Sequence, residues 1–142
     1  MSIVERRSAP RYSVSLPGTA VTEAGHVSSI EVTNISSSGL QFLVNQAEIP
    51  ELLPNMGQAN TLSPVPILLN IELSSDDNLD IKPQPLEIKC GIVYVQRKSI
   101  ELCMVGCRFE EFINNSDQRL EQYIQQHDKS SSLKLLNDES LI

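Results

Sequence analysis

The chain has 142 residues, a formal net charge of −7 at pH 7 and no tryptophan. A chain of this length can bury a sizeable core and suits a single domain. Its acidic balance and few aromatic residues argue against binding along a nucleic-acid polymer, because that affinity comes from phosphate contacts on a broad basic surface and from base stacking on aromatic rings.

Positive charge is concentrated at the N-terminus. Arg6, Arg7 and Arg11 lie within the first eleven residues, and no other Lys or Arg follows until Lys82, although eight Asp and Glu residues do. Residues 1–11 have too few apolar side chains to pack by themselves. We therefore predict a mobile N-terminal arm over residues 1–11, and its isolated cationic charge predicts that it binds a small anion.

Alternating apolar and polar residues after the arm predict two hairpins. The first strand starts at Tyr12, has a bulge at residues 17–18 and ends in a turn at 24–26. A second strand follows that turn. The polar loop from Asn34 to Gly39 then joins it to a third strand, so that a second hairpin is expected.

Three more strands and a short helix are predicted downstream. Residues 45–66 contain four prolines and a stretch over 48–53 that is compatible with a short helix. We expect this segment to be an ordered connection between strands rather than a flexible linker. Apolar stripes over 67–73 and 86–94 predict two long, half-buried strands, and a third strand is expected over 101–109.

The apolar spacing changes to a helical period after Phe112. It predicts a C-terminal helix that Asn115 or Ser116 can cap. The predicted fold is therefore mainly all-β, a six- to seven-stranded antiparallel β-barrel with a C-terminal α-helix, because a barrel leaves no exposed strand edges. The domain is expected to span 12–129, and residues 130–142 form an acidic, serine-containing tail.

The chain shows no sign of catalysis. It has no nucleophile elbow, phosphate-binding Gly loop or HExxH, and its two histidines have no acid or nucleophile at motif spacing. We expect no catalytic residues, no cofactor and no enzymatic activity.

Its three cysteines are Cys90, Cys103 and Cys107. An odd number suits reduced thiols in a cytosol, and buried thiols explain them better than a metal site because no second pair stands at zinc-ligand spacing. The sequence has neither an apolar run after a basic start nor an apolar stretch long enough to span a membrane. We expect a cytoplasmic protein that is not membrane-embedded.

Two short stretches resemble a known family. Residues 7–11, Arg-Ser-Ala-Pro-Arg, have the spacing RxxxR, and residues 34–39, Asn-Ile-Ser-Ser-Ser-Gly, have the spacing [D/N]xSxxG. Their order and separation, followed by barrel-like strands, are similar to the PilZ domain, the bacterial receptor module for cyclic di-GMP. The resemblance covers residues 5–125. It implies a receptor or adaptor that acts in trans on an unidentified effector protein controlling motility, pili, biofilm or polysaccharide output.

The resemblance also implies which residues hold the ligand. Arg7 and Arg11 match the two arginines of the family's first motif and would clamp phosphate and guanine edges. Arg6 matches the residue before that motif, where arginine accompanies an intercalated pair of ligand molecules, which implies two cyclic di-GMP per protomer. Asn34, Ser36 and Gly39 match the second motif.

The residue types suit a ligand with two phosphodiesters and two guanines. Arginine binds phosphate bidentately, donates to guanine O6 and N7, and stacks on a base. The oxygen of Asn34 can accept from guanine N1 or N2, and the Ser36 hydroxyl can serve base or phosphate. Gly39 suits a position with positive φ or close backbone approach.

Two other functions stay open at this point. In the first, the chain is a PilZ-like protein-interaction adaptor that does not use the nucleotide, although its intact motifs count against this. In the second, the arm binds RNA or DNA, which predicts steep salt dependence and binding to any polyanion. The acidic remainder of the chain disfavours the second function.

Overall fold

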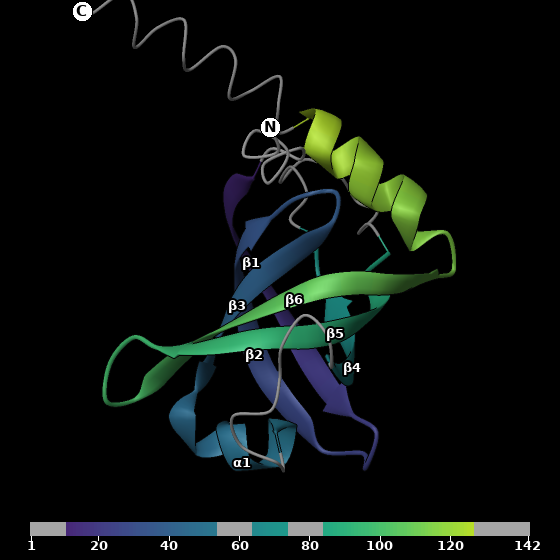
Figure 1. Ribbon diagram of the computed structural model, residues 1–142. Helices are drawn as coiled ribbons and strands as arrows, with labels where there is room; N and C mark the ends of the chain where they lie inside the picture. Colours follow the sequence, from purple (N-terminus) through teal and green to yellow (C-terminus); the bar gives the residue numbers. More distant parts are fainter. Residues whose placement is uncertain (1–10, 54–63, 74–83, 127–142) are drawn as a thin grey trace, which may run out of the picture.

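The computed structural model describes residues 11–53, 64–73 and 84–126, in which six antiparallel strands close into a barrel (Figure 1). The strands are β1 (Tyr12–Thr22), β2 (Val27–Ile35), β3 (Gly39–Asn45), β4 (Val65–Ile71), β5 (Leu86–Arg97) and β6 (Leu102–Ile113). They pair in the order β1-β2-β3-β6-β5-β4 around the barrel.

A 3-10 turn, η2 (Gln46–Glu48), and a helix, α1 (Ile49–Leu52), follow β3. Residues 116–126 are helical. The predicted barrel with a C-terminal helix is confirmed, with six strands.

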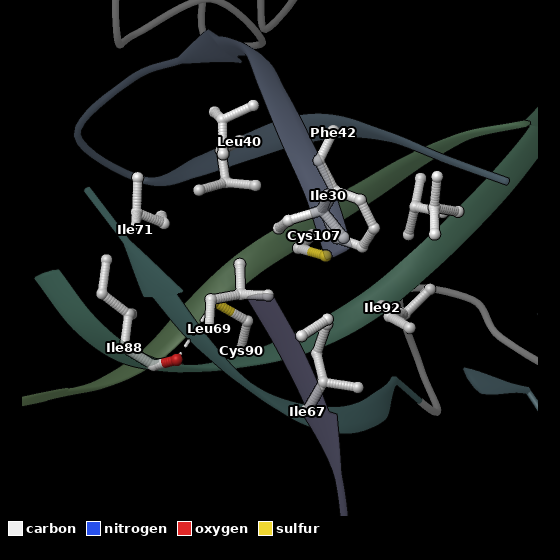
Figure 2. Close-up of a cluster of buried hydrophobic side chains, with 14 of the residues drawn as sticks. Ile30, Leu40, Phe42, Ile67, Leu69, Ile71, Ile88, Cys90, Ile92 and Cys107 are labelled. Carbon is white, nitrogen blue, oxygen red and sulfur yellow. Dashed lines mark hydrogen bonds between the residues drawn. The ribbon is translucent and has the colours of Figure 1, made fainter. Parts of the chain in front are cut away.

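The barrel interior is filled by alternate side chains of every strand, as the apolar stripes predict. Phe42, Leu69, Ile88 and Ile92 are completely buried, and several of them meet in the cluster shown in Figure 2. The residues between these buried positions on each strand face outward, so polar residues of β2, β3, β5 and β6 share the outer surface.

The three cysteines belong to this interior. Cys90, Cys103 and Cys107 are buried free thiols, as predicted, and the Cys90 Sγ donates to the carbonyl of Ile88 at 3.7 Å (Figure 2). Burial raises the pKa of Cys90 and of Cys107 well above the ordinary thiol value. Both groups are therefore neutral apolar side chains at physiological pH. Within the described ranges no cluster of His, Cys, Asp and Glu could hold a metal ion.

The first hairpin differs from the prediction in one respect. The turn at residues 24–26 is present, with Gly25 at a φ of 95°. The bulge predicted at residues 17–18 is wrong, because Pro17 and Gly18 pair regularly with β2 and the irregularity falls earlier, between Ser13 and Leu16. Gly18 instead allows close packing, since a Cβ there would lie 2.4 Å from the Asn70 carbonyl oxygen of β4.

One end of the barrel is closed by η2 and α1, which confirms the predicted short helix (Figure 1). Glu48 ties this cap to the first hairpin. Its Oε1 accepts from Ser28 Oγ at 2.7 Å and lies 2.9 Å from His26 Nε2. The hydrogen bond from Ser28, followed by that from His26, lowers the pKa of Glu48 below its ordinary value.

The C-terminal helix starts after two left-handed residues, Asn114 and Asn115, with φ values of 55° and 60°. The carbonyl of Asn115 accepts from the Gln118 amide at 3.2 Å, and the Ser116 hydroxyl accepts from the Glu87 amide at 2.8 Å. Ser116 therefore anchors the helix start to β5 rather than capping it. The helix packs on the barrel through Leu120, which is buried.

Candidate functional site

A pocket of about 160 Å³ lies on the outside of the barrel beside the β2–β3 loop. This loop is at the end of the barrel away from α1 (Figure 1). It gathers four of the six predicted site residues, Arg11, Asn34, Ser36 and Gly39. Arg6 and Arg7 lie outside the described residues. The structure therefore brings the second arginine of RxxxR and the polar and glycine residues of [D/N]xSxxG to one place, although 22 residues separate Arg11 from Asn34.

The tight loop of the second hairpin is held by Ser36, which is only 4% exposed. Its hydroxyl accepts from the amides of Ser38 and Gly39, each at 3.2 Å, and donates to the Gly39 carbonyl. The Ser36 amide also donates to that carbonyl at 2.9 Å. In this structure the Ser36 side chain thus fixes the loop, while a direct contact of its hydroxyl with the ligand stays a prediction.

Gly39 is needed for a close approach between strands. A Cβ at this position would lie 2.3 Å from the Cys107 carbonyl oxygen of β6 and 3.2 Å from the Arg108 Cα. The only glycine with positive φ among the described residues is Gly25, so of the two reasons expected for Gly39 the close approach is the one observed. The loop is pinned further by Phe109, whose amide donates to the Ser38 carbonyl at 3.0 Å.

Asn34 occupies an irregular position on β2. It pairs with Ser13 of β1 and with Gln41 of β3, and the register of the β2–β3 ladder shifts between Val32 and Asn34. The side chain of Asn34 is half-buried and lines the pocket. Its amide can therefore present both an acceptor and donors toward a ligand there.

The pocket is also lined by residues that the motifs do not include, among them Gln41, Tyr94, Gly106 and Arg108. Cross-strand pairing forms a row across four strands, because Asn34 lies opposite Gln41, Gln41 opposite Gly106, and Gly106 opposite Tyr94. Paired residues share one face of a sheet. The side chains of Asn34, Gln41 and Tyr94 therefore lie on the same outer surface.

Arg108 adds a second cation to the pocket. It pairs with Gly39 on one side and with Gly91 on the other, so neither cross-strand neighbour covers its stem with a side chain. Its Nε donates to Glu110 Oε2 at 3.1 Å, and its side chain is 47% exposed. Arg11 and Arg108 are the charged residues that line this pocket, in a chain whose net charge is −7. An anion is the ligand class that this charge favours.

A cluster at the other end of the barrel resembles a catalytic triad by composition only. Ser28 is 1% exposed and donates to Glu48, and His26 contacts the same carboxylate oxygen. A nucleophilic serine needs a hydrogen bond to the base that removes its proton. Here Ser28 and His26 both bind the acid, so the cluster has a structural role.

Comparison with known proteins gives a family match over most of the chain. A sequence model of the PilZ domain matches residues 5–126. Comparison with curated protein sequences gives no match. No helix in the described part of the chain has the length and apolar character needed to cross a membrane.

Several solved structures share the fold, and three of them are compared with this chain. The PilZ domain with c-di-GMP of YcgR from Escherichia coli is 12% identical, with a TM-score of 0.63 over 92% of this chain and 97% of that one. The MrkH–c-di-GMP complex from K. pneumonia is 12% identical, with a TM-score of 0.64 and coverage of 91% and 55%. The inhibitor of motility MotI from Bacillus subtilis is 17% identical, with a TM-score of 0.59 and coverage of 88% and 52%. The chain thus spans about half the length of the MrkH and MotI chains.

Proposed function

Because the chain belongs to the PilZ domain family, we propose that it is a receptor for cyclic di-GMP that acts in trans on an effector protein. The observation that carries this proposal is the pocket that Arg11, Asn34, Ser36 and Gly39 line together. Two of the similar structures, the YcgR domain and MrkH, contain c-di-GMP. The fold likeness alone would support only the architecture.

The chemistry of the pocket suits each part of this ligand. Guanidinium groups of Arg11 and Arg108 offer planar donors for a phosphodiester or for guanine O6 and N7. The amide of Asn34 can accept from guanine N1 or N2. As a neutral acceptor it makes a weaker bond than a carboxylate would, since charge-assisted hydrogen bonds are roughly twice as strong.

We propose that further residues complete the site, because the pocket is small for such a ligand. Pockets that enclose a drug-sized ligand usually measure roughly 300–1,000 Å³, whereas this one measures about 160 Å³. We propose that Arg6 and Arg7 close over the remainder of the ligand, and that two cyclic di-GMP molecules bind per protomer. Ligand binding then changes the surface that the effector meets, as expected for a receptor without chemistry of its own.

The setting and output are proposed on the same basis. We place the receptor in the cytoplasm, as a binding protein and not an enzyme, with motility, pili, biofilm or polysaccharide synthesis as the class of output. The name of the similar MotI, an inhibitor of motility, supports the first of these. The net charge of −7 supports a small ligand over a nucleic-acid polymer.

Calorimetric titration tests the proposal. Cyclic di-GMP, GTP and a short oligonucleotide are titrated into the chain at two salt concentrations. We expect saturable binding of cyclic di-GMP at two equivalents and much weaker binding of the other two. Equal binding of all three with steep salt dependence would point to a general polyanion site, and the lack of any binding would favour the nucleotide-independent adaptor. Saturation at one equivalent would overturn the stoichiometry alone.

A further inference from the structure

We propose that Tyr94 is a ligand-contacting residue of the pocket, whose ring packs against a guanine base while Gln41 holds that ring in position. The inference rests on the proposed function and concerns residues outside both sequence motifs. Tyr94 is 38% exposed. The chain has only three tyrosines and no tryptophan, so few of its aromatic rings could stack on a base. An aromatic side chain exposed at the wall of a pocket is a candidate for contact with a base.

The ring of Tyr94 is placed by the backbone beneath it. Gly106 lies directly opposite on β6, and a Cβ there would lie 2.2 Å from ring atoms Cε2 and Cζ. The phenol end of the ring therefore lies over the Gly106 backbone, in the space that the Cβ of any other residue at position 106 would occupy. This contact holds the ring close to the sheet surface.

Gln41 fixes the ring from the other side of β6. Its Nε2 donates to the Tyr94 hydroxyl, and the two residues pair with Gly106 from opposite sides. The bond spans one strand and directs the ring toward β3. A side chain that is ordered before the ligand arrives loses less conformational entropy on binding, so the ring can contribute more of its contact energy to affinity.

The cross-strand row also sets the distance from Tyr94 to Asn34, whose side-chain amide is proposed to accept from guanine. Asn34, Gln41, Gly106 and Tyr94 occupy successive strands. Strands lie about 4.8 Å apart, so the backbones of Asn34 and Tyr94 are separated by roughly 14 Å. The ring reaches back over part of that distance. Asn34 and the exposed face of the ring lie on the same outer surface, so a planar base that stacks on the ring can turn its edge toward Asn34.

The test compares three variants with the wild-type chain in cyclic di-GMP titrations. Tyr94→Leu removes the aromatic ring, and Tyr94→Phe removes only the hydroxyl that Gln41 binds. Gln96→Leu is the matched control, because Gln96 is an exposed residue of the same strand outside the pocket. We expect about tenfold weaker binding for Tyr94→Leu, a change of about threefold or less for Tyr94→Phe, and wild-type affinity for Gln96→Leu.

Tyrosine fluorescence supplies a readout that a purely structural role would not change. Since the chain has no tryptophan, its emission comes from Tyr12, Tyr94 and Tyr123. Ligand should quench wild-type emission more than that of Tyr94→Phe. Wild-type affinity in Tyr94→Leu, or equal quenching in wild type and Tyr94→Phe, overturns the inference while leaving the receptor function intact. A wild-type chain that binds no cyclic di-GMP overturns both. If Tyr94→Leu fails to fold, the quenching comparison decides.

Discussion

Replacing Gly39 with alanine tests whether the close approach of β3 and β6 shapes the pocket. The added Cβ would lie 2.3 Å from the Cys107 carbonyl oxygen, about 0.7 Å closer than the 3.0 Å that real Cβ atoms respect. Because the obstacle is backbone, no side chain can rotate away. The first residue pair of the β3–β6 ladder, Gly39 with Arg108, must separate.

This separation should affect both stability and binding. Overpacking of a dense region costs about 1–3 kcal/mol, which corresponds to a fall in Tm of roughly 3–10 °C for a domain of this size. The same shift displaces Gly39, which lines the pocket together with Ser36 and Arg11. We expect about tenfold weaker binding of cyclic di-GMP, the equivalent of one lost hydrogen bond to a charged group.

Thermal melts and calorimetry, both on folded protein well below its Tm, measure the two effects. Gly25→Ala is the matched control. Gly25 has a φ of 95° with nothing near its missing Cβ, so alanine there is strained by its backbone alone. It should lower the free energy of unfolding by about 1 kcal/mol and leave binding unchanged. A Gly39→Ala chain with wild-type Tm and affinity would refute the reasoning.

Substitutions at four other positions, Arg7, Arg11, Asn34 and Glu48, test the charges and hydrogen bonds. Arg7→Ala or Arg11→Ala should weaken binding of cyclic di-GMP about 10- to 100-fold by calorimetry without lowering Tm. Arg97→Ala, at the distant β5–β6 turn, is the control and should bind normally. Wild-type affinity in the first two variants would disprove the proposal that Arg7 and Arg11 hold the ligand. Asn34→Asp should tighten binding several-fold by making a charge-assisted bond, and weaker binding would contradict the role of Asn34 as a guanine acceptor. Glu48→Gln should flatten the pH dependence of urea unfolding on acidification below roughly pH 5, and identical pH profiles would count against this effect.

The sign of the last prediction follows from the pKa of Glu48. Hydrogen bonds from Ser28 and His26 lower that pKa in the folded state, so they stabilise the ionised carboxylate. The stabilisation is present above the unfolded pKa and is lost as pH falls through the folded one. The wild-type free energy of unfolding should therefore decrease more on acidification than that of Glu48→Gln, which cannot titrate.

Strands were predictable from sequence where alternation was regular, and less so where charge interrupted it. The strand predicted over residues 101–109 stops before the charged pair Glu110 and Glu111. In the structure β6 continues to Ile113. Its pairing with β5 brings the Nζ of Lys89 within 3.6 Å of a Glu111 carboxylate oxygen, so outward-facing charge is accommodated on the barrel surface.

The candidate site was predictable only where residues lie close together in the sequence or match a motif. Asn34, Ser36 and Gly39 stand within six residues. Gln41 and Tyr94 are 53 residues apart and meet because β3 neighbours β6, which in turn neighbours β5. Alternation identifies the outer face of each strand but not which strands pair or in what register. The isolated Gly106 in an apolar strand was the available sign of a close approach.

Amide chemical shifts of the ¹⁵N-labelled chain, followed during addition of cyclic di-GMP, test ligand and site together. The receptor account predicts that resonances of residues 34–39 and 106–108 shift and saturate, while those of α1 at the opposite end of the barrel stay unchanged. A spectrum that does not change at saturating ligand, or that changes at α1 and not at the pocket, would contradict it.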